Sequence, residues 1–167
     1  MPTSFERLAH LILTADGVNY VAKQHRSSAM RDSRIEKVDL ALTEIAQDPS
    51  EKVALWQWAC REMLHETLIG MHQLSHLAGI ARHVASDWRA PVDVIAPAKP
   101  YLAASALADR RLPHVLDGLG STDDAHDRAD LWRLRYASLI ASTLQGMQAL
   151  AEKHRIDRQA LATGPLN

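Results

Sequence analysis

Apolar residues recur every three to four positions along most of this 167-residue chain, and strict alternation of apolar and polar residues never lasts beyond a few positions. The first spacing gives an α-helix one apolar face, whereas a half-buried strand needs the second. Aromatic residues make up only 5% of the chain, which is a poor supply for strands. The sequence therefore predicts an all-α fold.

The length of the chain fits one domain, and no linker rich in Gly, Ser or Pro divides it. No internal repeat is apparent. We therefore expect a single helical domain over residues 1–167, a bundle of about five main helices. The long third helix is expected at its centre, packed against the last.

Start and stop signals divide the chain into helices. The strongest start is Asp48-Pro49-Ser50-Glu51, which offers a capping carboxylate, a proline at the first helical position and a glutamate three residues after the cap. The expected elements are a helix over about 4–29, one from Ser33 to Gln47, one from Asp48 to about Trp88, one over 101–111, a loop over 117–121, a long helix capped by Ser121 or Thr122, and a short helix over 157–162.

The third helix carries unusual polar residues. On a helical wheel, Glu62, Glu66 and Gln73 project into its apolar arc, where a carboxylate needs a cation, a donor, a metal or a proton. Trp56 and Trp58 lie on well-separated faces, which predicts burial on more than one side, by the bundle alone or by a second subunit.

Four of the nine histidines lie on one stripe along the border of that arc: His65, His72, His76 and His83. Border positions commonly hold side chains that bury a ring and keep one polar atom in water, so a solvated helix border is one interpretation. A partner helix is a second interpretation, and histidines in such a contact would make association depend on pH near neutrality. The partner-binding candidates are Trp58, Arg61, His65, His72, His76 and His83.

Metal binding is the third interpretation of the stripe. His72 and His76 are four residues apart, close enough to chelate one ion, and Glu62 with His65 forms a Glu-x-x-His step similar to those of ferritin-like di-iron bundles. That resemblance ends there, because the chain offers no second Glu-x-x-His on another helix. The candidate ligands of a divalent metal ion, the one cofactor considered, are Glu62, His65, His72 and His76.

Basic residues gather around the first interhelical turn. They are Lys23, Arg26, Arg31, Arg34 and Lys37. Basic clusters at helix ends are usually solvated faces, but a small helical subunit can also contact a nucleic-acid backbone through such a local patch. The net charge of -1 excludes a generally basic surface.

Signatures of catalysis are missing from the sequence, including the P-loop, Gly-x-Ser-x-Gly and His-Glu-x-x-His. The single cysteine, Cys60, cannot close an internal disulfide and reads as an inert core residue. No segment is long and apolar enough for a membrane helix, and we expect a cytoplasmic protein. The leading hypothesis is a non-catalytic helical interaction or regulatory module, a homodimer or a subunit of a larger complex. The alternatives are a nucleic-acid-contacting subunit and a metal-binding bundle.

Overall fold

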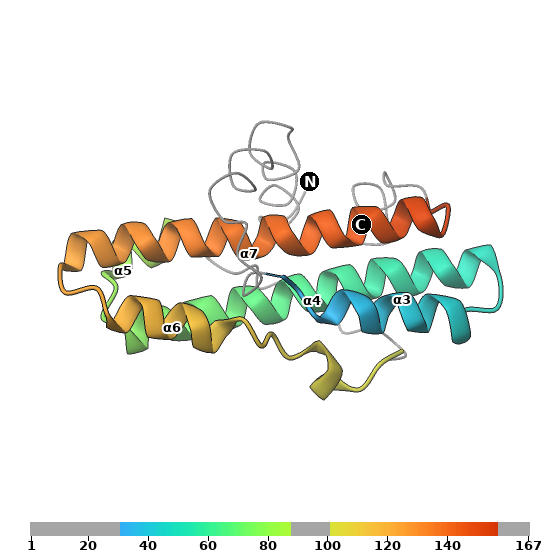
Figure 1. Ribbon diagram of the computed structural model, residues 1–167, viewed down its shortest axis with the longest axis horizontal. Helices are drawn as coiled ribbons and strands as arrows, with labels where there is room; N and C mark the ends of the chain where they lie inside the picture. Colours follow the sequence, from blue (N-terminus) through green and yellow to red (C-terminus); the bar gives the residue numbers. More distant parts are fainter. Residues whose placement is uncertain (1–30, 88–100, 157–167) are drawn as a thin grey trace.

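A computed structural model describes residues 31–87 and 101–156 of the chain, and this part is helical without strands (Figure 1). The all-α prediction is confirmed. The expected helices over 4–29 and 157–162 lie outside the described residues. No described helix is long and apolar enough to cross a membrane. The elements are α3 (Arg34–Glu44), α4 (Pro49–Leu77), α5 (Arg82–Asp87), the 3₁₀ turn η2 (Ala104–Leu107), α6 (Leu112–Gly120) and α7 (Ala125–Lys153).

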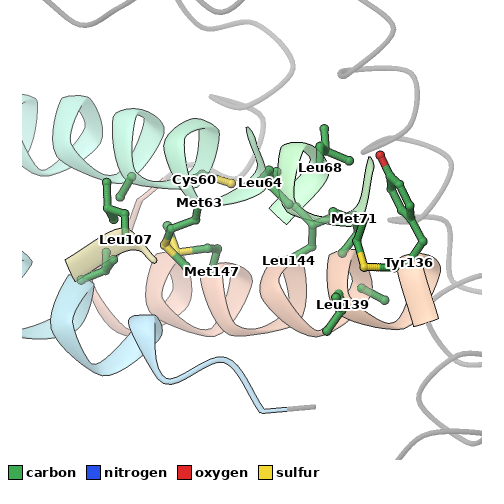
Figure 2. Close-up of a cluster of buried hydrophobic side chains, with 14 of the residues drawn as sticks. Cys60, Met63, Leu64, Leu68, Met71, Leu107, Tyr136, Leu139, Leu144 and Met147 are labelled. Atoms are coloured by element: carbon green, nitrogen blue, oxygen red, sulfur yellow. The ribbon is translucent and has the colours of Figure 1, made fainter. Parts of the chain in front are cut away.

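Two helical hairpins build the bundle. Helix α3 leads into α4 and α6 leads into α7, while α4 and α7 run antiparallel along each other (Figure 1). The shorter helices α3 and α6 each pack against both long ones. Apolar side chains of α4 and α7 meet between the two helices, among them Met63, Leu64, Met71, Leu144 and Met147 (Figure 2). The prediction that the third helix is central and packs against the last is confirmed.

The start of α4 is predicted correctly and its end is not. Asp48 caps the helix by accepting a hydrogen bond from the Glu51 N–H. The helix ends at Leu77, well before the expected Trp88, because Gly79 adopts a φ of 68° and the Ile80 N–H closes the last turn on the Ser75 carbonyl. Left-handed backbone of this kind ends a helix and favours glycine.

The start of α3 after Ser33 is predicted correctly, although the Ser33 side chain makes no cap and the Arg34 N–H instead donates to the Asp32 carboxylate. Three other expected boundaries are wrong. Helix α7 begins after Asp124, which caps it in place of Ser121 or Thr122. Within the expected helix over 101–111 the chain forms only the short turn η2. The expected loop over 117–121 belongs largely to α6, which runs from Leu112 to Gly120. Pro113 does not prevent this helix, because it stands in the first turn, where its N–H would have no helical partner.

The described chain contains an internal repeat, contrary to the sequence-based prediction. Helices α4 and α7 have the same length of 29 residues, and each follows an aspartate that caps it through a side-chain oxygen. The first half, residues 31–80, and the second half, residues 108–156, share identical residues at matched positions. The matched identities are Asp32/Asp109, Arg34/Arg111, Val38/Val115, Leu42/Leu119, Asp48/Asp124, Leu55/Leu131, Trp56/Trp132, Thr67/Thr143, Leu68/Leu144, Gly70/Gly146, Met71/Met147, Leu74/Leu150 and Ile80/Ile156.

The matched residues also make matched contacts. The indole N–H of Trp56 donates to the Met147 carbonyl over 2.8 Å, and that of Trp132 donates to the Met71 carbonyl over 2.9 Å. Both tryptophans are buried. Such reciprocal contacts are those of an approximate twofold axis, so the two halves pack as a pair of equivalent units.

Candidate functional site

Six polar side chains lie at the centre of the bundle, between the two halves. Each half supplies one aspartate, one arginine and one threonine, and all six are buried. We call this set the buried ion cluster: Asp32, Arg34, Thr67, Asp109, Arg111 and Thr143. Four charges of balanced sign therefore occupy a place where apolar residues would be expected.

In the first half, Arg34 forms two hydrogen bonds with the aspartate two residues before it. Its Nε donates to Asp32 Oδ1 and its Nη2 donates to Asp32 Oδ2, both over 2.8 Å. Its Nη1 donates to the carbonyls of Met63 and Leu107 over 2.9 and 3.0 Å, and its Nη2 also reaches the Thr67 hydroxyl. A planar guanidinium suits this task because its donors form a rigid fork that matches a carboxylate.

The second half repeats the arrangement. Arg111 Nε donates to Asp109 Oδ1 over 2.9 Å, and Arg111 Nη2 donates to Asp109 Oδ2 over 2.7 Å. Its Nη1 donates to the carbonyl of Leu139, the residue that matches Met63, and its Nη2 donates to the Thr143 hydroxyl. The local motif is thus Asp-x-Arg in both halves.

Hydrogen bonds between the halves close the buried ion cluster. Thr67 donates to Asp109 and Thr143 donates to Asp32, each over 2.6 Å. Ion pairs also cross between the halves, from Arg34 to Asp109 and from Arg111 to Asp32, both at 3.3 Å. Each carboxylate is therefore held by one half and completed by the other.

The electrostatics of the cluster favour ionised aspartates. Burial by itself disfavours the charged form of Asp109, but the hydrogen bond and charge of Arg111 outweigh it and lower the pKa to about 2. At Asp32, burial is likewise outweighed by the hydrogen bond from Arg34 and the charge of Arg111, and the pKa is lowered. With its carboxylates charged and its guanidinium groups hydrogen-bonded, the cluster links the two halves through ion pairs and hydrogen bonds.

The position of Arg34 corrects the expected basic patch. Arg34 is 1% exposed, so it cannot meet a phosphate backbone at the surface. Arg31 is exposed and pairs with Glu36 over 2.9 Å, and Lys37 is exposed as well. Lys23 and Arg26 lie outside the described residues. Of the five expected cations, the described part of the chain therefore presents Arg31 and Lys37 to solvent.

Helix α4 is rotated relative to the helical-wheel expectation. Glu66 and Gln73 are exposed and Glu62 is half-buried, so the apolar arc does not contain them. The helical wheel assumed a helix to about Trp88, so it included residues beyond Leu77 that do not share the phase of α4. Once the helix ends at Leu77, the buried face centres on the side that carries Trp56, Thr67 and Met71.

The histidines do not form one continuous stripe. His83 belongs to α5, beyond the break in the chain. His72 is half-buried and packs edge-on against Trp132 and Tyr136 of α7, with ring centroids 5.9 and 5.8 Å apart. His76 is exposed. His65 is half-buried, and its Nδ1 has no hydrogen-bond partner within the described residues.

No metal centre emerges from the part of the chain that the structure describes. Glu62, His65, His72 and His76 do not combine into a group of three or more ligands that could hold an ion, and no other such group occurs among residues 31–87 and 101–156. His72 faces the aromatic rings of α7, while His76 is exposed to solvent. The two histidines that the spacing suggested as joint metal ligands therefore lie in different surroundings.

Two further candidates on α4 are core residues. Trp58 is 4% exposed and packs edge-on against Tyr101, with ring centroids 5.5 Å apart, so it is not part of an open partner-binding surface. Its burial together with that of Trp56 confirms that α4 is covered on more than one side. Cys60 is fully buried, as expected, and burial raises the pKa of its thiol to about 12.

Arg61 remains half-buried at the edge of α4, beside the exposed positions of the helix. Those exposed positions include two large apolar residues, Ile69 and Leu77, which are 37% and 72% exposed. We call the exposed and half-buried face of this helix the α4 stripe. Its members are Arg61, Glu62, His65, Glu66, Ile69, Gln73, His76 and Leu77.

Comparisons with known proteins add no relative. No family model, curated protein or solved structure matches the chain.

Proposed function

We propose that the chain is a non-catalytic interaction module that binds an amphipathic helix of a protein partner along the α4 stripe. The observation that carries this proposal is the exposure of Ile69 and Leu77 on that face. Leu77 follows Ile69 by eight positions, a little over two helical turns, so one apolar stripe of a partner helix can cover both.

The internal repeat provides a control for this argument. The position that matches Ile69 in the second half is Gln145, and the position that matches Leu77 is Lys153. Both are exposed and polar, as solvent-facing residues of a helix usually are. The fold shared by the halves thus does not require apolar residues at these positions.

The chemistry of the core supports a binding rather than a catalytic role. The Cys60 thiol is buried with a raised pKa, and the charges of the buried ion cluster are engaged with one another. A thiol in this state is a poor nucleophile. The α4 stripe, in contrast, offers apolar contacts beside the charged side chains of Arg61 and Glu66.

The test replaces stripe residues by those of the second half, which are compatible with this fold. The variant carries Ile69→Gln, His76→Glu and Leu77→Lys, after the matched Gln145, Glu152 and Lys153. The control variant carries Gln145→Ser and Ala149→Ser on the equivalent face of α7. Solution mass and quantitative cross-linking, followed by identification of the cross-linked peptides, are measured for both variants and for the natural chain.

In the natural chain and in the control variant, we expect a helix of the partner to cross-link to α4. The stripe variant should lose this cross-link. Thermal melting should be unchanged, because all the substituted positions are exposed. A monomer without any helical partner contradicts the proposal, and so does equal cross-linking of all three proteins. If the partner is a second copy of the chain, the mass of the natural protein will be that of a dimer.

A further inference from the structure

The surface that joins the two halves meets the requirement for pairing between identical units. In such a pair, if residue i of one unit contacts residue j of the other, then j must also contact i across the axis. The contacts between the halves obey this rule four times. They are Trp56–Met147 with Trp132–Met71, Thr67–Asp109 with Thr143–Asp32, Arg34–Asp109 with Arg111–Asp32, and Gly70–Leu112 with Gly146–Ile35.

The fourth pair of contacts shows that the shapes match as well as the polar groups. A Cβ atom on Gly146 would lie 2.7 Å from the side chain of Ile35, and one on Gly70 would overlap Leu112. Each half therefore places a branched apolar side chain over a glycine of the other half. Because glycine has no side chain, the helices can approach closely at both places.

From this reciprocity we propose that each half carries a complete binding surface for a copy of itself, and that the chain is a fused pair of such units. In the four pairs of contacts named above, each half meets in the other the residue types that it presents itself, apart from Ile35, which is matched by Leu112. The partner that fits the inner face of α3 and α4 is thus a second α3–α4 hairpin.

The buried ion cluster explains why one unit needs another. Within a half, Asp109 Oδ2 receives a hydrogen bond from Arg111, while Thr67 of the other half supplies a second. Without a second half, the threonine hydroxyl and the outer carboxylate oxygen would each lose this partner, whereas a second copy of the same half offers the same two groups in return. The aspartate and arginine of each half cancel in charge, so the pairing of two copies adds no net charge.

The test builds full-length chains from two copies of one half. In the first chimera, residues 31–80 are replaced by residues 108–156, and in the second, residues 108–156 are replaced by residues 31–80. Circular dichroism, thermal melting and solution mass are then measured. A matched control is each chimera with valine in place of both copies of its threonine, Thr143 or Thr67.

We expect at least one chimera to fold as a helical chain with a cooperative thermal transition, and its valine control to melt at a lower temperature. If neither chimera shows a cooperative transition, the proposal is wrong. A second measurement uses the natural chain, in which Thr67→Val and Thr143→Val should lower the melting midpoint by equal amounts, within about 2 °C, because the two threonines donate to matched aspartates. A clear inequality between these two shifts would show that the halves do not present equivalent surfaces.

Discussion

Thr67 donates a hydrogen bond to Asp109 over 2.6 Å, and this bond crosses from α4 to the turn before α6. The same hydroxyl accepts a hydrogen bond from Arg34 over 2.9 Å, so it connects the cation of its own half to the carboxylate of the other half. A hydroxyl can do both because it carries one donor and two acceptor lone pairs. The stability of the bundle should therefore depend strongly on two threonines.

Replacing either threonine by valine tests this dependence. Valine keeps the shape of threonine but cannot donate, so Thr67→Val leaves Asp109 with one donor fewer and Thr143→Val does the same to Asp32. We expect each variant to lose about 1–3 kcal/mol of unfolding free energy, measured by urea denaturation. The control is Thr43→Val at an exposed position of α3, which should change stability by less than about 0.5 kcal/mol. An equal loss of unfolding free energy at all three positions would contradict a special role for the two buried threonines.

The two buried arginines should not tolerate lysine. Arg34 uses Nε, Nη1 and Nη2 at once, whereas lysine offers a single ammonium group. We expect Arg34→Lys and Arg111→Lys each to destabilise the protein by about 3–5 kcal/mol, the range found when a buried charge loses its partners. Arg110→Lys is the matched control, because Arg110 is exposed and directly precedes Arg111. A melting temperature that does not change in Arg34→Lys would place this side chain in solvent.

Acid should weaken the fold in a defined range of pH. The pKa of Asp109 is lowered from 3.8 to about 2, and the pKa of Asp32 is lowered as well. As the pH falls from about 4 to about 2, the unfolded chain takes up protons that the folded chain still excludes, so unfolding becomes more favourable. The contribution of these groups is complete above pH 4 and is lost as the pH falls through 2. Urea denaturation at several pH values should show this loss, and a free energy that stays constant between pH 4 and 2 would contradict it.

The fold class followed from apolar spacing, but the buried ion cluster could not be found that way. Spacing places apolar residues on a face, whereas Asp32 and Arg34 stand just outside or at the very start of a helix, where charged residues are usually solvated. Their burial depends on Thr67, Asp109 and the carbonyl groups of other elements, which are distant in sequence. The available signal was the Asp-x-Arg motif, which occurs again at Asp109 and Arg111.

The internal repeat was missed for a related reason. Residues of α3 match those of α6 at a separation of 77 positions, as in Arg34 and Arg111, whereas Trp56 and Trp132 in the long helices are separated by 76. The one-residue difference falls in the turn between the helices. Several of the shared residues make the contacts between the halves, whereas exposed positions differ, such as Ile69 against Gln145, and these differences dominate a direct comparison of the two sequences.

Glu66 provides a test of the orientation of α4. A buried carboxylate at this position would make Glu66→Gln strongly destabilising, but the side chain is exposed. We therefore expect the substitution to change the free energy of unfolding by less than about 0.5 kcal/mol. Val38→Ala, in the core, provides a positive control with a larger loss. If Glu66→Gln loses as much stability as the core variant, Glu66 lies on the buried face of α4 and the orientation described here is wrong.

The Cys60 thiol should report on opening of the core. It is fully buried between the long helices, and burial raises its pKa to about 12, so thiolate is scarce at neutral pH (Figure 2). Because the thiolate is the species that reacts, a thiol-specific disulfide reagent should modify the native protein very slowly and the urea-unfolded protein rapidly. Thr67→Val, which weakens the contact between the halves, should speed the native reaction by the factor by which it raises the population of the opened core, since the thiol becomes accessible through opening. Rapid modification of the native protein in the absence of urea would show that Cys60 is not enclosed by α4 and α7.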